Sequence, residues 1–298
     1  MGTTKLKPNA YARRMSITFA KGHGTGNDFV IIPDDAGQLL ITAEQVRRIT
    51  DRRKGIGADG ILRVVPTALA GDADVAALAD VAPWFMDYRN ADGSIAEMCG
   101  NGVRVFAHFL RTTSRVTSDE FIVATRGGAK HVRVLEDGHY SVAMGLSHPI
   151  SSDAPISVRV GGHVWTGSGV ELPNPHAVVF VQSLEDAGAL LEAPTVAPAA
   201  AYPHGANVEF VVEVSDRHVA MRVFERGVGE TLSCGTGACA VAWAARRRAD
   251  ASGDTSWRVD VPGGTLTVDE DERGMITLSG PAEIVATGVL SPDMWIAR

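Results

Sequence analysis

Two cysteines in this sequence stand at the start of matching glycine-rich turns. Cys99 begins Cys-Gly-Asn-Gly and Cys234 begins Cys-Gly-Thr-Gly, and a helical pattern follows each turn. A helix N-terminus favours a thiolate, because its free N–H groups and its dipole stabilise negative charge. Bare backbone amides in such turns can also bind a carboxylate. The amides in question are those of Gly100, Asn101, Gly235 and Thr236.

Two thiols on opposite sides of one carbon predict inversion of a stereocentre. A thiolate removes the α-proton from one face, and the other thiol delivers a proton to the opposite face. One thiol must then be ionised while the other is protonated, so their titrations are coupled. We therefore expect Cys99 and Cys234 to form the acid and base pair of a racemase or epimerase. The third cysteine, Cys239, lies among Ala238, Ala240 and Val241 and is expected to be a core residue.

Polar residues elsewhere in the chain fit a substrate that is charged at both ends. Glu225 can receive an ammonium group, and Arg226 can bind a carboxylate through two parallel hydrogen bonds. Uncharged donors and acceptors are offered by Asn27, Asn90, Asn174 and Asn207. A single asparagine is more often a turn residue than a ligand, but the repeated placement of these four favours binding of an α-amino acid. His176 is either a proton-linked group or a structural histidine.

The polar residues and cysteines recur in the same order, which indicates an internal duplication. Cys234 follows Cys99 by 135 residues, and Asn174-Pro175-His176 follows Asn27-Asp28-Phe29 by 147. A third pair, Gly57-Ala58-Asp59 and Gly205-Ala206-Asn207, has an offset of 148. Repetition at a near-constant offset is the mark of duplicated architecture. We therefore predict two similar half-domains that face one another.

Composition limits the class of protein. The 298 residues include 35 acidic and 28 basic side chains, for a net charge of -7. This acidic balance argues against non-specific binding to nucleic acid or to anionic lipid. No apolar run approaches the roughly 18 residues of a membrane span. The basic start of the chain lacks the apolar stretch of a signal peptide, and three cysteines fit free thiols, so we expect a cytoplasmic protein.

Periodicity predicts a strand-rich α+β protein. Strands are predicted over residues 29–32, 61–65, 121–123 and 131–135. Helices are predicted over residues 43–51, 103–111, 184–191 and 238–249. Residues 193–201, with Pro194 and Pro198 among alanines, are predicted to form a surface loop. Residues 1–14 lack apolar periodicity and are predicted to be a mobile extension.

Several of these motifs together closely resemble diaminopimelate epimerase. The resemblance extends over about residues 16–290 and rests on numerous, ordered motifs. The motifs are His23-Gly24-Thr25-Gly26-Asn27-Asp28-Phe29, Gly55-Ile56-Gly57-Ala58-Asp59-Gly60, Tyr88-Arg89-Asn90-Ala91-Asp92-Gly93-Ser94, Cys99-Gly100-Asn101-Gly102, Asn174-Pro175-His176, Asn207-Val208-Glu209-Phe210 and Glu225-Arg226 through Cys234-Gly235-Thr236-Gly237.

The resemblance implies interconversion of LL- and meso-2,6-diaminopimelate without pyridoxal phosphate or metal, in the pathway to lysine and peptidoglycan precursors. It also implies a homodimer of two pseudo-symmetric, barrel-like domains, each a mostly antiparallel sheet around a central helix, with the active site in the cleft between them. We expect half-domains over residues 1–143 and 144–283, with residues 284–298 returning to the first.

By the same resemblance, Cys99 and Cys234 match the acid and base, which exchange roles in the reverse direction. The matched substrate-binding positions are Asn27, Asn90, Gly100, Asn101, Asn174, Asn207, Glu225, Arg226, Gly235 and Thr236. His176 and Glu225 match positions that tune catalysis. Gly60 departs from the family pattern, because many members carry a glutamine there that contacts substrate. That contact is either missing here or supplied by another residue.

Two other functions remain open. A proline racemase or hydroxyproline epimerase uses the same paired thiols, but its cyclic substrate has no distal ammonium and carboxylate to engage Arg226 and the asparagines. A redox switch would join Cys99 and Cys234 in a reversible disulfide.

Cofactor-dependent chemistry is not expected. The glycines at 22–26 lack dinucleotide-binding spacing. Cys234 and Cys239 have no second pair to complete a zinc site. Pyridoxal phosphate needs a Schiff-base lysine, and the second half of the chain has none.

Overall fold

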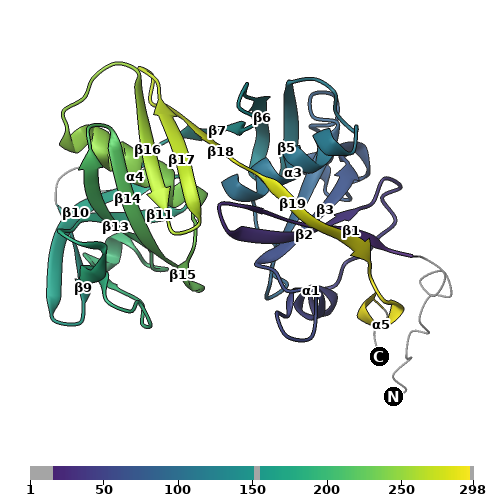
Figure 1. Cartoon of the computed structure of the whole chain (residues 1–298), viewed down its shortest axis with the longest axis horizontal. Coiled ribbons are helices and arrows are strands. Elements are labelled where there is room, and N and C mark those ends of the chain that lie inside the picture. The colour runs from purple at the N-terminus through teal and green to yellow at the C-terminus, as the bar shows by residue number, and fades with distance from the viewer. Residues whose placement is uncertain (1–15, 151–154, 296–298) are drawn as a thin grey trace.

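The computed structural model describes residues 16–150 and 155–295. The extension predicted for residues 1–14 lies outside this described part. Two bodies stand side by side, and in each of them strands curl around one long helix (Figure 1). This is the strand-rich α+β architecture, with two barrel-like domains, that the sequence and its resemblance predicted.

The first half of the structure is built on a sheet around helix α3. Its strands are β1 (Thr18–Gly24), β2 (Asn27–Pro33), β3 (Gly60–Pro66), β4 (Trp84–Asn90), β5 (Glu120–Thr125), β6 (Gly128–Val134) and β7 (Tyr140–Leu146). Its helices are α1 (Ala43–Thr50), α2 (Ala73–Ala76) and α3 (Gly100–Thr112), with a 3-10 turn η1 (Thr67–Leu69). The pairs β2–β3 and β4–β5 are parallel, and the other neighbours are antiparallel.

The second half repeats this order of pairings around helix α4. Its strands are β8 (His148–Pro149), β9 (Ile156–Val160), β10 (His163–Glu171), β11 (Pro175–Phe180), β12 (Thr195–Ala197), β13 (Asn207–Ser215), β14 (His218–Glu225), β15 (Gly229–Thr231), β16 (Thr255–Val261), β17 (Gly264–Glu270) and β18 (Met275–Gly280). Its helical elements are η2 (Leu184–Ala187), η3 (Ala199–Ala201) and α4 (Gly235–Arg248). Here β11–β13 and β14–β16 are the parallel pairs.

Strand register shows how closely the two halves correspond. Phe29 lies opposite Gly60 across the β2–β3 pair, and His176 lies opposite Asn207 across the β11–β13 pair. The same offset of 147 residues therefore relates Phe29 to His176 and Gly60 to Asn207. The counterpart of Asn207 is Gly60, so the sequence alignment of Asn207 with Asp59 is wrong by one residue. The duplication itself is present in the pairing of the strands.

The chain crosses between the halves twice. Strand β7 pairs with β18 of the other half, and β8, which follows β7, pairs with β10. In the same way β19 (Glu283–Val289), which follows β18, returns to pair with β1. The short helix α5 (Pro292–Trp295) then lies near α1 (Figure 1).

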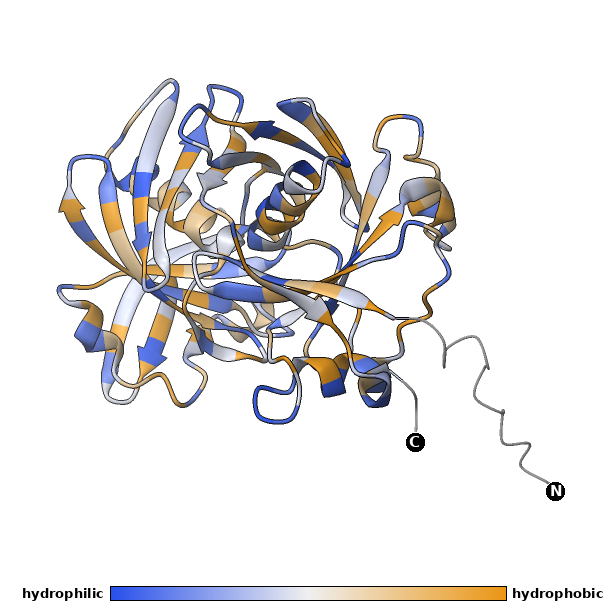
Figure 2. Ribbon diagram, turned by 45° about the vertical axis from the view of Figure 1, so that its right-hand side comes forward, coloured by the Kyte–Doolittle hydropathy of each residue, from blue (hydrophilic) through white to orange (hydrophobic). Residues whose placement is uncertain are grey.

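Apolar burial holds each central helix inside its sheet. Along α3, the side chains of Val103, Phe106 and Leu110 are fully buried, and the helix packs on β1 and β7. Many strands alternate between hydrophobic and hydrophilic residues (Figure 2), as expected for sheets with one face on a core. Each fully buried large apolar side chain contributes about 1.5–3 kcal/mol. The helix N-termini are thereby fixed within the core.

The predicted helices differ from the structure mainly at their ends. Helices α3 and α4 begin three residues earlier than predicted, directly after their cysteines. The helix predicted over residues 184–191 is wrong, because only the 3-10 turn η2 forms before Gly188, whose φ of +65° ends it. The predicted loop at residues 193–201 contains the short strand β12 and the turn η3.

None of the helices in residues 16–150 and 155–295 combines the length and the apolar character that a membrane-spanning helix needs.

Candidate active site

Both turn cysteines cap the helix that follows them. Cys99 and Cys234 have extended backbones at the N-cap positions of α3 and α4. The Gly102 amide donates to Cys99 Sγ at 3.4 Å, and the Gly237 amide donates to Cys234 Sγ at 3.4 Å. Each sulfur therefore occupies the position that a serine or aspartate oxygen takes in an ordinary N-cap.

The two helix N-termini meet where Gly235 faces Asn101. A Cβ atom at Gly235 would lie 3.2 Å from Asn101 Oδ1 and 3.4 Å from the Asn101 amide nitrogen. A Cβ at either Gly100 or Gly235 would come within 3.0 Å of Leu278 Cδ2. A side chain at Gly235 would crowd the start of the other helix, whereas one at Gly100 would crowd the side chains of Met144 and Leu278.

Asn101 ties the two turns together by hydrogen bonds. Its Nδ2 donates to the carbonyl oxygen and to the hydroxyl of Ser233, each at 3.2 Å, and more weakly to Asn27 Oδ1 at 3.4 Å. Ser233 Oγ is also 2.7 Å from Thr25 Oγ1. Residues of the loop before β2 are therefore held against the turn that begins at Cys234.

Burial dominates the electrostatics of the thiols. It raises the pKa of Cys99 to about 11, in spite of the Gly102 amide and the nearby guanidinium of Arg104. Burial also raises the pKa of Cys234, and the carboxylates of Glu225 and Glu209 raise it further. The amide hydrogen bonds at the helix N-termini lower both pKa values, as predicted, but desolvation of the thiolate outweighs them, so each thiol has a raised pKa.

Asn27 lies beside Cys99 with its amide orientation fixed. Its Nδ2 donates to Asp59 Oδ2 at 2.7 Å, so its Oδ1 faces the thiol, which donates to it at 3.5 Å. Arg52 bridges Asp59 and Asp28 behind this contact. Asp59 therefore holds Asn27 in the orientation that presents its oxygen to Cys99.

Asn90 stands at the end of β4, opposite Gly60 in the sheet. Its side chain donates to Ser94 Oγ at 3.0 Å. In the described part of the chain, its hydrogen bonds do not reach the other predicted site residues. The structure therefore supports a turn role for Asn90 and leaves its binding role as a prediction.

On the other side, Asn174 is linked to the Cys234 turn through a buried histidine. Asn174 Oδ1 is 3.0 Å from His176 Nε2, and His176 Nδ1 is 2.6 Å from Glu209 Oε1. His176 and Glu209 have fully buried side chains. A Cβ at Gly237 would lie only 2.9 Å from the same Glu209 oxygen. This chain of contacts joins Asn174 to the turn that carries Cys234.

Asn207, Glu225 and Arg226 form the remaining part of the predicted set. Asn207 Oδ1 accepts a hydrogen bond from the Arg226 amide at 2.9 Å. The Arg226 side chain is exposed, and among the described residues it donates one hydrogen bond, to the carbonyl oxygen of His204 at 3.5 Å. Thr231 donates to Glu225 Oε1 at 2.5 Å, and burial raises the pKa of this carboxyl group. Glu225 interacts electrostatically with both turn thiols.

Tyr88 lies close to the candidate site, although it was not among the site residues predicted from the sequence. Its ring packs edge-on against Phe29, with centroids 5.8 Å apart. Burial raises the pKa of its phenol, and the negative forms of Cys99, Glu225, Asp59 and Cys234 add to this shift. Tyr88 therefore lies within electrostatic reach of both thiols. Its position directly before Arg89-Asn90 was a sequence signal that pointed to the site.

Cys239 is a core residue, as predicted. Its side chain is fully buried within the main apolar cluster, and burial raises its pKa to about 12. All three cysteines are free thiols. Within the described ranges, no group of three or more histidine, cysteine or acidic residues is placed to hold a metal ion.

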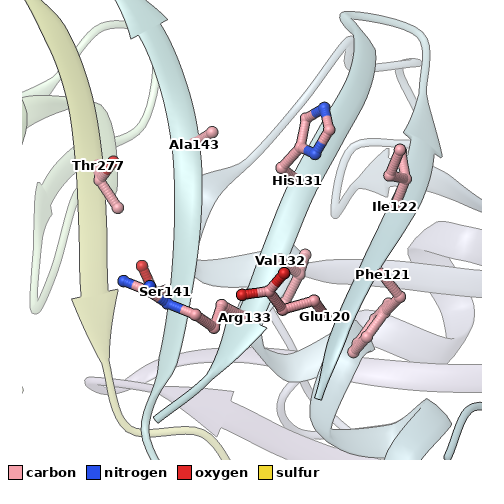
Figure 3. A pocket seen from close by; sticks show the side chains of 9 residues that line it. All are labelled: Glu120, Phe121, Ile122, His131, Val132, Arg133, Ser141, Ala143 and Thr277. Atoms are coloured by element: carbon pink, nitrogen blue, oxygen red, sulfur yellow. The ribbon is translucent and has the colours of Figure 1, made fainter. Parts of the chain in front are cut away.

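A shallow hollow elsewhere on the molecule takes no part in this arrangement. It has a volume of about 380 Å³ and lies on β5, β6, β7 and Thr277 of β18 (Figure 3). Neither Cys99 nor Cys234 lines it.

Comparisons with a family model and with known proteins point to the same family. The family model for "Diaminopimelate epimerase" matches residues 19–148 and 170–285. The chain is similar to a protein of that name from Streptomyces coelicolor, with 52% identity over 277 residues, 91% of this chain and 94% of the relative. It is 48% identical to the protein of that name from Corynebacterium glutamicum (strain R), over 92% of this chain and 98% of the relative.

Solved structures show the same fold at much lower identity. The structure of a Bacillus anthracis phenazine biosynthesis protein of the PhzF family has a TM-score of 0.65 and 16% identity, covering 93% of this chain and 99% of that one. A hydroxyproline epimerase from Agrobacterium vitis, with bound trans-4-OH-L-proline, has a TM-score of 0.65 and 14% identity, covering 95% and 97%. These two likenesses concern the fold alone. Because the family model matches most of this chain and the relatives named above are 48–52% identical to it, the chain belongs to the diaminopimelate epimerase family and is an isomerase.

Proposed function

We propose that this enzyme interconverts LL- and meso-2,6-diaminopimelate by a two-base mechanism in which Cys99 and Cys234 are the catalytic residues. The observation that carries the proposal is that each of these thiols caps a helix and that the two helix N-termini meet at Asn101 and Gly235. Relatives at up to 52% identity bear the name diaminopimelate epimerase.

The proposed chemistry moves one proton in and one proton out. A thiolate forms an S–H bond with the α-hydrogen as the C–H bond breaks, and the electron pair stays on carbon as a carbanion. The opposite thiol then breaks its S–H bond and protonates the other face of that carbon. The negative charge passes from one sulfur to the other, and the reverse reaction exchanges the roles of Cys99 and Cys234. These steps need only the two thiols.

The turn amides would bind the carboxylate next to the reacting carbon. Free N–H groups at a helix N-terminus favour an anion, and those proposed are the amides of Gly100, Asn101, Gly235 and Thr236. A bound carboxylate there would also stabilise the negative charge that develops during proton removal.

The other polar side chains would bind the rest of the substrate. We assign Asn27, Asn90, Asn174, Asn207, Glu225 and Arg226 to this role. His176 and Glu225 would tune the thiols. Within residues 16–150 and 155–295, the exposed Arg226 guanidinium hydrogen-bonds to one carbonyl oxygen, so its other donors could bind the distal carboxylate.

A substrate panel tests this function. Reduced enzyme would be incubated with LL-2,6-diaminopimelate, with L-proline and with trans-4-hydroxy-L-proline, and the products would be separated by chiral chromatography. The proposal expects meso-2,6-diaminopimelate from the first substrate and no epimer from the two cyclic ones. Turnover of a cyclic substrate alone would reassign the enzyme to the proline racemase type, and no turnover by folded, reduced enzyme would refute the proposal.

We further propose that the enzyme acts as a cytoplasmic homodimer in the formation of lysine and peptidoglycan precursors. The free thiols support a reducing compartment, and the pathway follows from the proposed substrate. Light scattering coupled to size-exclusion chromatography would give the mass, which should be twice that of the 31.5 kDa chain. A monomer mass at working concentration would contradict the dimer.

A further inference from the structure

The pseudo-symmetry of the two halves makes their differences informative. The strand register that places Phe29 opposite Gly60 and His176 opposite Asn207 also makes Leu62 the counterpart of Glu209. The first half therefore has two apolar residues, Phe29 and Leu62, where the second half has the buried pair His176 and Glu209. Both pairs lie directly beneath the turn that carries a catalytic thiol.

The contacts at the two turns show this difference in detail. A Cβ at Gly102 would meet Leu62 Cδ2 at 3.5 Å and Phe29 Cζ at 3.6 Å. A Cβ at the equivalent Gly237 would meet Glu209 Oε1 at 2.9 Å and Cys234 Sγ at 3.3 Å. One small group at Gly237 would therefore touch both the carboxylate and the thiol, whereas the space beneath the Cys99 turn is apolar.

Glu209 is held as part of a pair rather than as a solvated acid. His176 Nδ1 is 2.6 Å from Glu209 Oε1, while the buried Oε2 of Glu209 has no hydrogen-bond partner among the described residues. Burial raises the pKa of Glu209, and the imidazole of His176 opposes that rise. His176 also reaches Asn174 Oδ1 through Nε2. Glu209 therefore sets the position of His176, and through it the position of the Asn174 amide.

A buried charge of opposite sign lies in the first half. Arg104, on α3, is fully buried, and its helix counterpart on α4 is the uncharged Cys239. Arg104 donates to the Pro281 carbonyl oxygen and to Thr25 Oγ1, and no residue that the structure describes is a hydrogen-bond partner of its Nη1. Throughout the described ranges, no carboxylate lies within ion-pair distance of Arg104. Its positive charge lowers the pKa of Cys99, against the larger effect of burial.

Other titratable groups lie near the thiols. Some interact electrostatically with both thiols, and others interact with Glu209 or Glu225. The Tyr88 phenol and the Glu225 carboxylate interact with both Cys99 and Cys234, and Glu225 also shares a hydrogen bond with the Cys234 thiol. Asp59 faces Glu225, and Tyr202 faces Glu209 from behind, with its hydroxyl donating to the His176 carbonyl at 3.4 Å. Among these groups, Glu209 acts on Cys234 and not on Cys99, and Arg104 acts on Cys99 and not on Cys234.

We infer that Glu209 is a positioning residue that acts on Cys234 alone, keeping that thiol protonated in the free enzyme, while Arg104 favours the thiolate at Cys99. This inference rests on the proposed two-thiol function and adds a resting state to it. The free enzyme is then prepared for the stereoisomer whose α-hydrogen faces Cys99. The opposite stereoisomer requires the proton to move first from Cys234 to Cys99.

Thiol alkylation tests the inference without using the epimerase reaction. Cys99→Ala leaves Cys234 as the turn thiol, and Cys234→Ala leaves Cys99. Each variant would be treated with iodoacetamide over a range of pH, and the modified cysteine would be identified by mass spectrometry, with Cys239 monitored separately. The pH midpoint of the alkylation rate is compared rather than the rate itself, because the two thiols differ in exposure. The midpoint of Cys99 should be the lower one.

Glu209→Gln, introduced into both backgrounds, gives the decisive comparison. It should lower the midpoint of Cys234 by about 1 pH unit, since a neighbouring negative charge is removed, and leave that of Cys99 unchanged. A lower midpoint for Cys234 in the parent proteins, an equal shift of both thiols, or no shift at either would overturn the inference.

Arg104→Met is the mirror variant and should raise the midpoint of Cys99 only. It also decides the question if Glu209→Gln unfolds, as judged by circular dichroism. An unchanged Cys99 midpoint in folded Arg104→Met would contradict the account. If the midpoints separate as expected while the wild type fails to epimerise diaminopimelate, the proposed function falls and the thiol asymmetry stands.

Discussion

The Cβ position of Gly60 lies 2.7 Å from Cε2 of Tyr88, so the Tyr88 ring fills the space that a side chain at residue 60 would need. The Arg89 carbonyl oxygen, at 2.4 Å, closes the same space from the neighbouring strand. Gly60 and Tyr88 therefore form a matched pair. We therefore propose Tyr88 as the residue that makes the substrate contact expected of a larger residue at position 60.

Tyr88→Phe should lower kcat/KM for diaminopimelate by about tenfold, because one hydrogen bond to a charged group is lost. The edge-on packing against Phe29 is kept, so the protein should fold normally. Tyr140→Phe is the matched control, since its hydroxyl contacts His108 at 3.1 Å, away from both thiols. Steady-state kinetics of the two variants would decide, and equal values of kcat/KM would rule out a role for the Tyr88 hydroxyl.

Replacement of either turn cysteine should abolish inversion. Cys99→Ala and Cys234→Ala each remove one of the two proton-transfer groups, which corresponds to a loss of about 10²–10⁴-fold or more. Cys239→Ala should retain activity, because this thiol is a core residue. Chiral chromatography of the products measures all three variants. Wild-type turnover by Cys99→Ala or Cys234→Ala would disprove the two-base mechanism.

The glycines at the third position of the two helices should respond differently to the same change. Gly237→Ala places a methyl group 2.9 Å from Glu209 Oε1, whereas at Gly102 the nearest atom is Cys99 Cβ at 3.3 Å. The methyl group at Gly237 must displace a buried carboxylate, so overpacking should cost about 1–3 kcal/mol there and less at Gly102. Urea unfolding and kcat would be compared. Equal effects of Gly237→Ala and Gly102→Ala would show that the difference between the turns is unimportant.

Alkaline pH should destabilise the protein partly through Cys239. Burial raises its pKa from 9.0 to about 12 in the folded state. As pH rises through the ordinary thiol pKa, the unfolded chain releases this proton while the folded chain keeps it. The contribution of Cys239 to the free energy of unfolding is therefore complete below the ordinary pKa and is lost as pH rises above it. Between about pH 8 and about pH 10.5 this thiol alone should cost about 2 kcal/mol of unfolding free energy.

The control for this pH effect is Cys239→Ala, unfolded by urea at both values. The cavity left by the substitution lowers the free energy of unfolding equally at both pH values, so its effect cancels when the two values are subtracted. The wild type should therefore lose more stability between the two values than the variant does. The same loss in both proteins would show that the Cys239 thiol does not keep its proton in the folded state.

Local sequence was sufficient to predict the two thiol turns and the duplication. Cys-Gly-x-Gly before an apolar helical pattern is a local signal, and Cys99 and Cys234 are indeed the N-caps of α3 and α4. The repeat was predictable because the two halves have the same order of strand pairings, so equivalent residues keep a nearly constant offset in the sequence. The shared position of Asn27 beside Cys99 and of Asn174 near the Cys234 turn agrees with that repeat.

Features that depend on tertiary contacts could not be predicted in this way. In the sequence, Glu209 is simply an acidic residue within a segment of strand-forming residues. The parallel pairing of β11 with β13 is what brings it to His176. Ser233 shows its role only when the two helix N-termini meet. The pKa of each thiol depends on burial by both halves, which a helix N-terminus in the sequence does not reveal.

The most direct test of the central claim is proton NMR of LL-2,6-diaminopimelate with reduced enzyme in D₂O at early times. With two bases, the meso product should carry deuterium at the inverted α-carbon, while the remaining LL substrate keeps its α-hydrogens. This follows because the thiol that protonates the product has exchanged with solvent. Early deuterium in both isomers, or meso product that retains the substrate hydrogen, would contradict proton transfer between Cys99 and Cys234 on opposite faces.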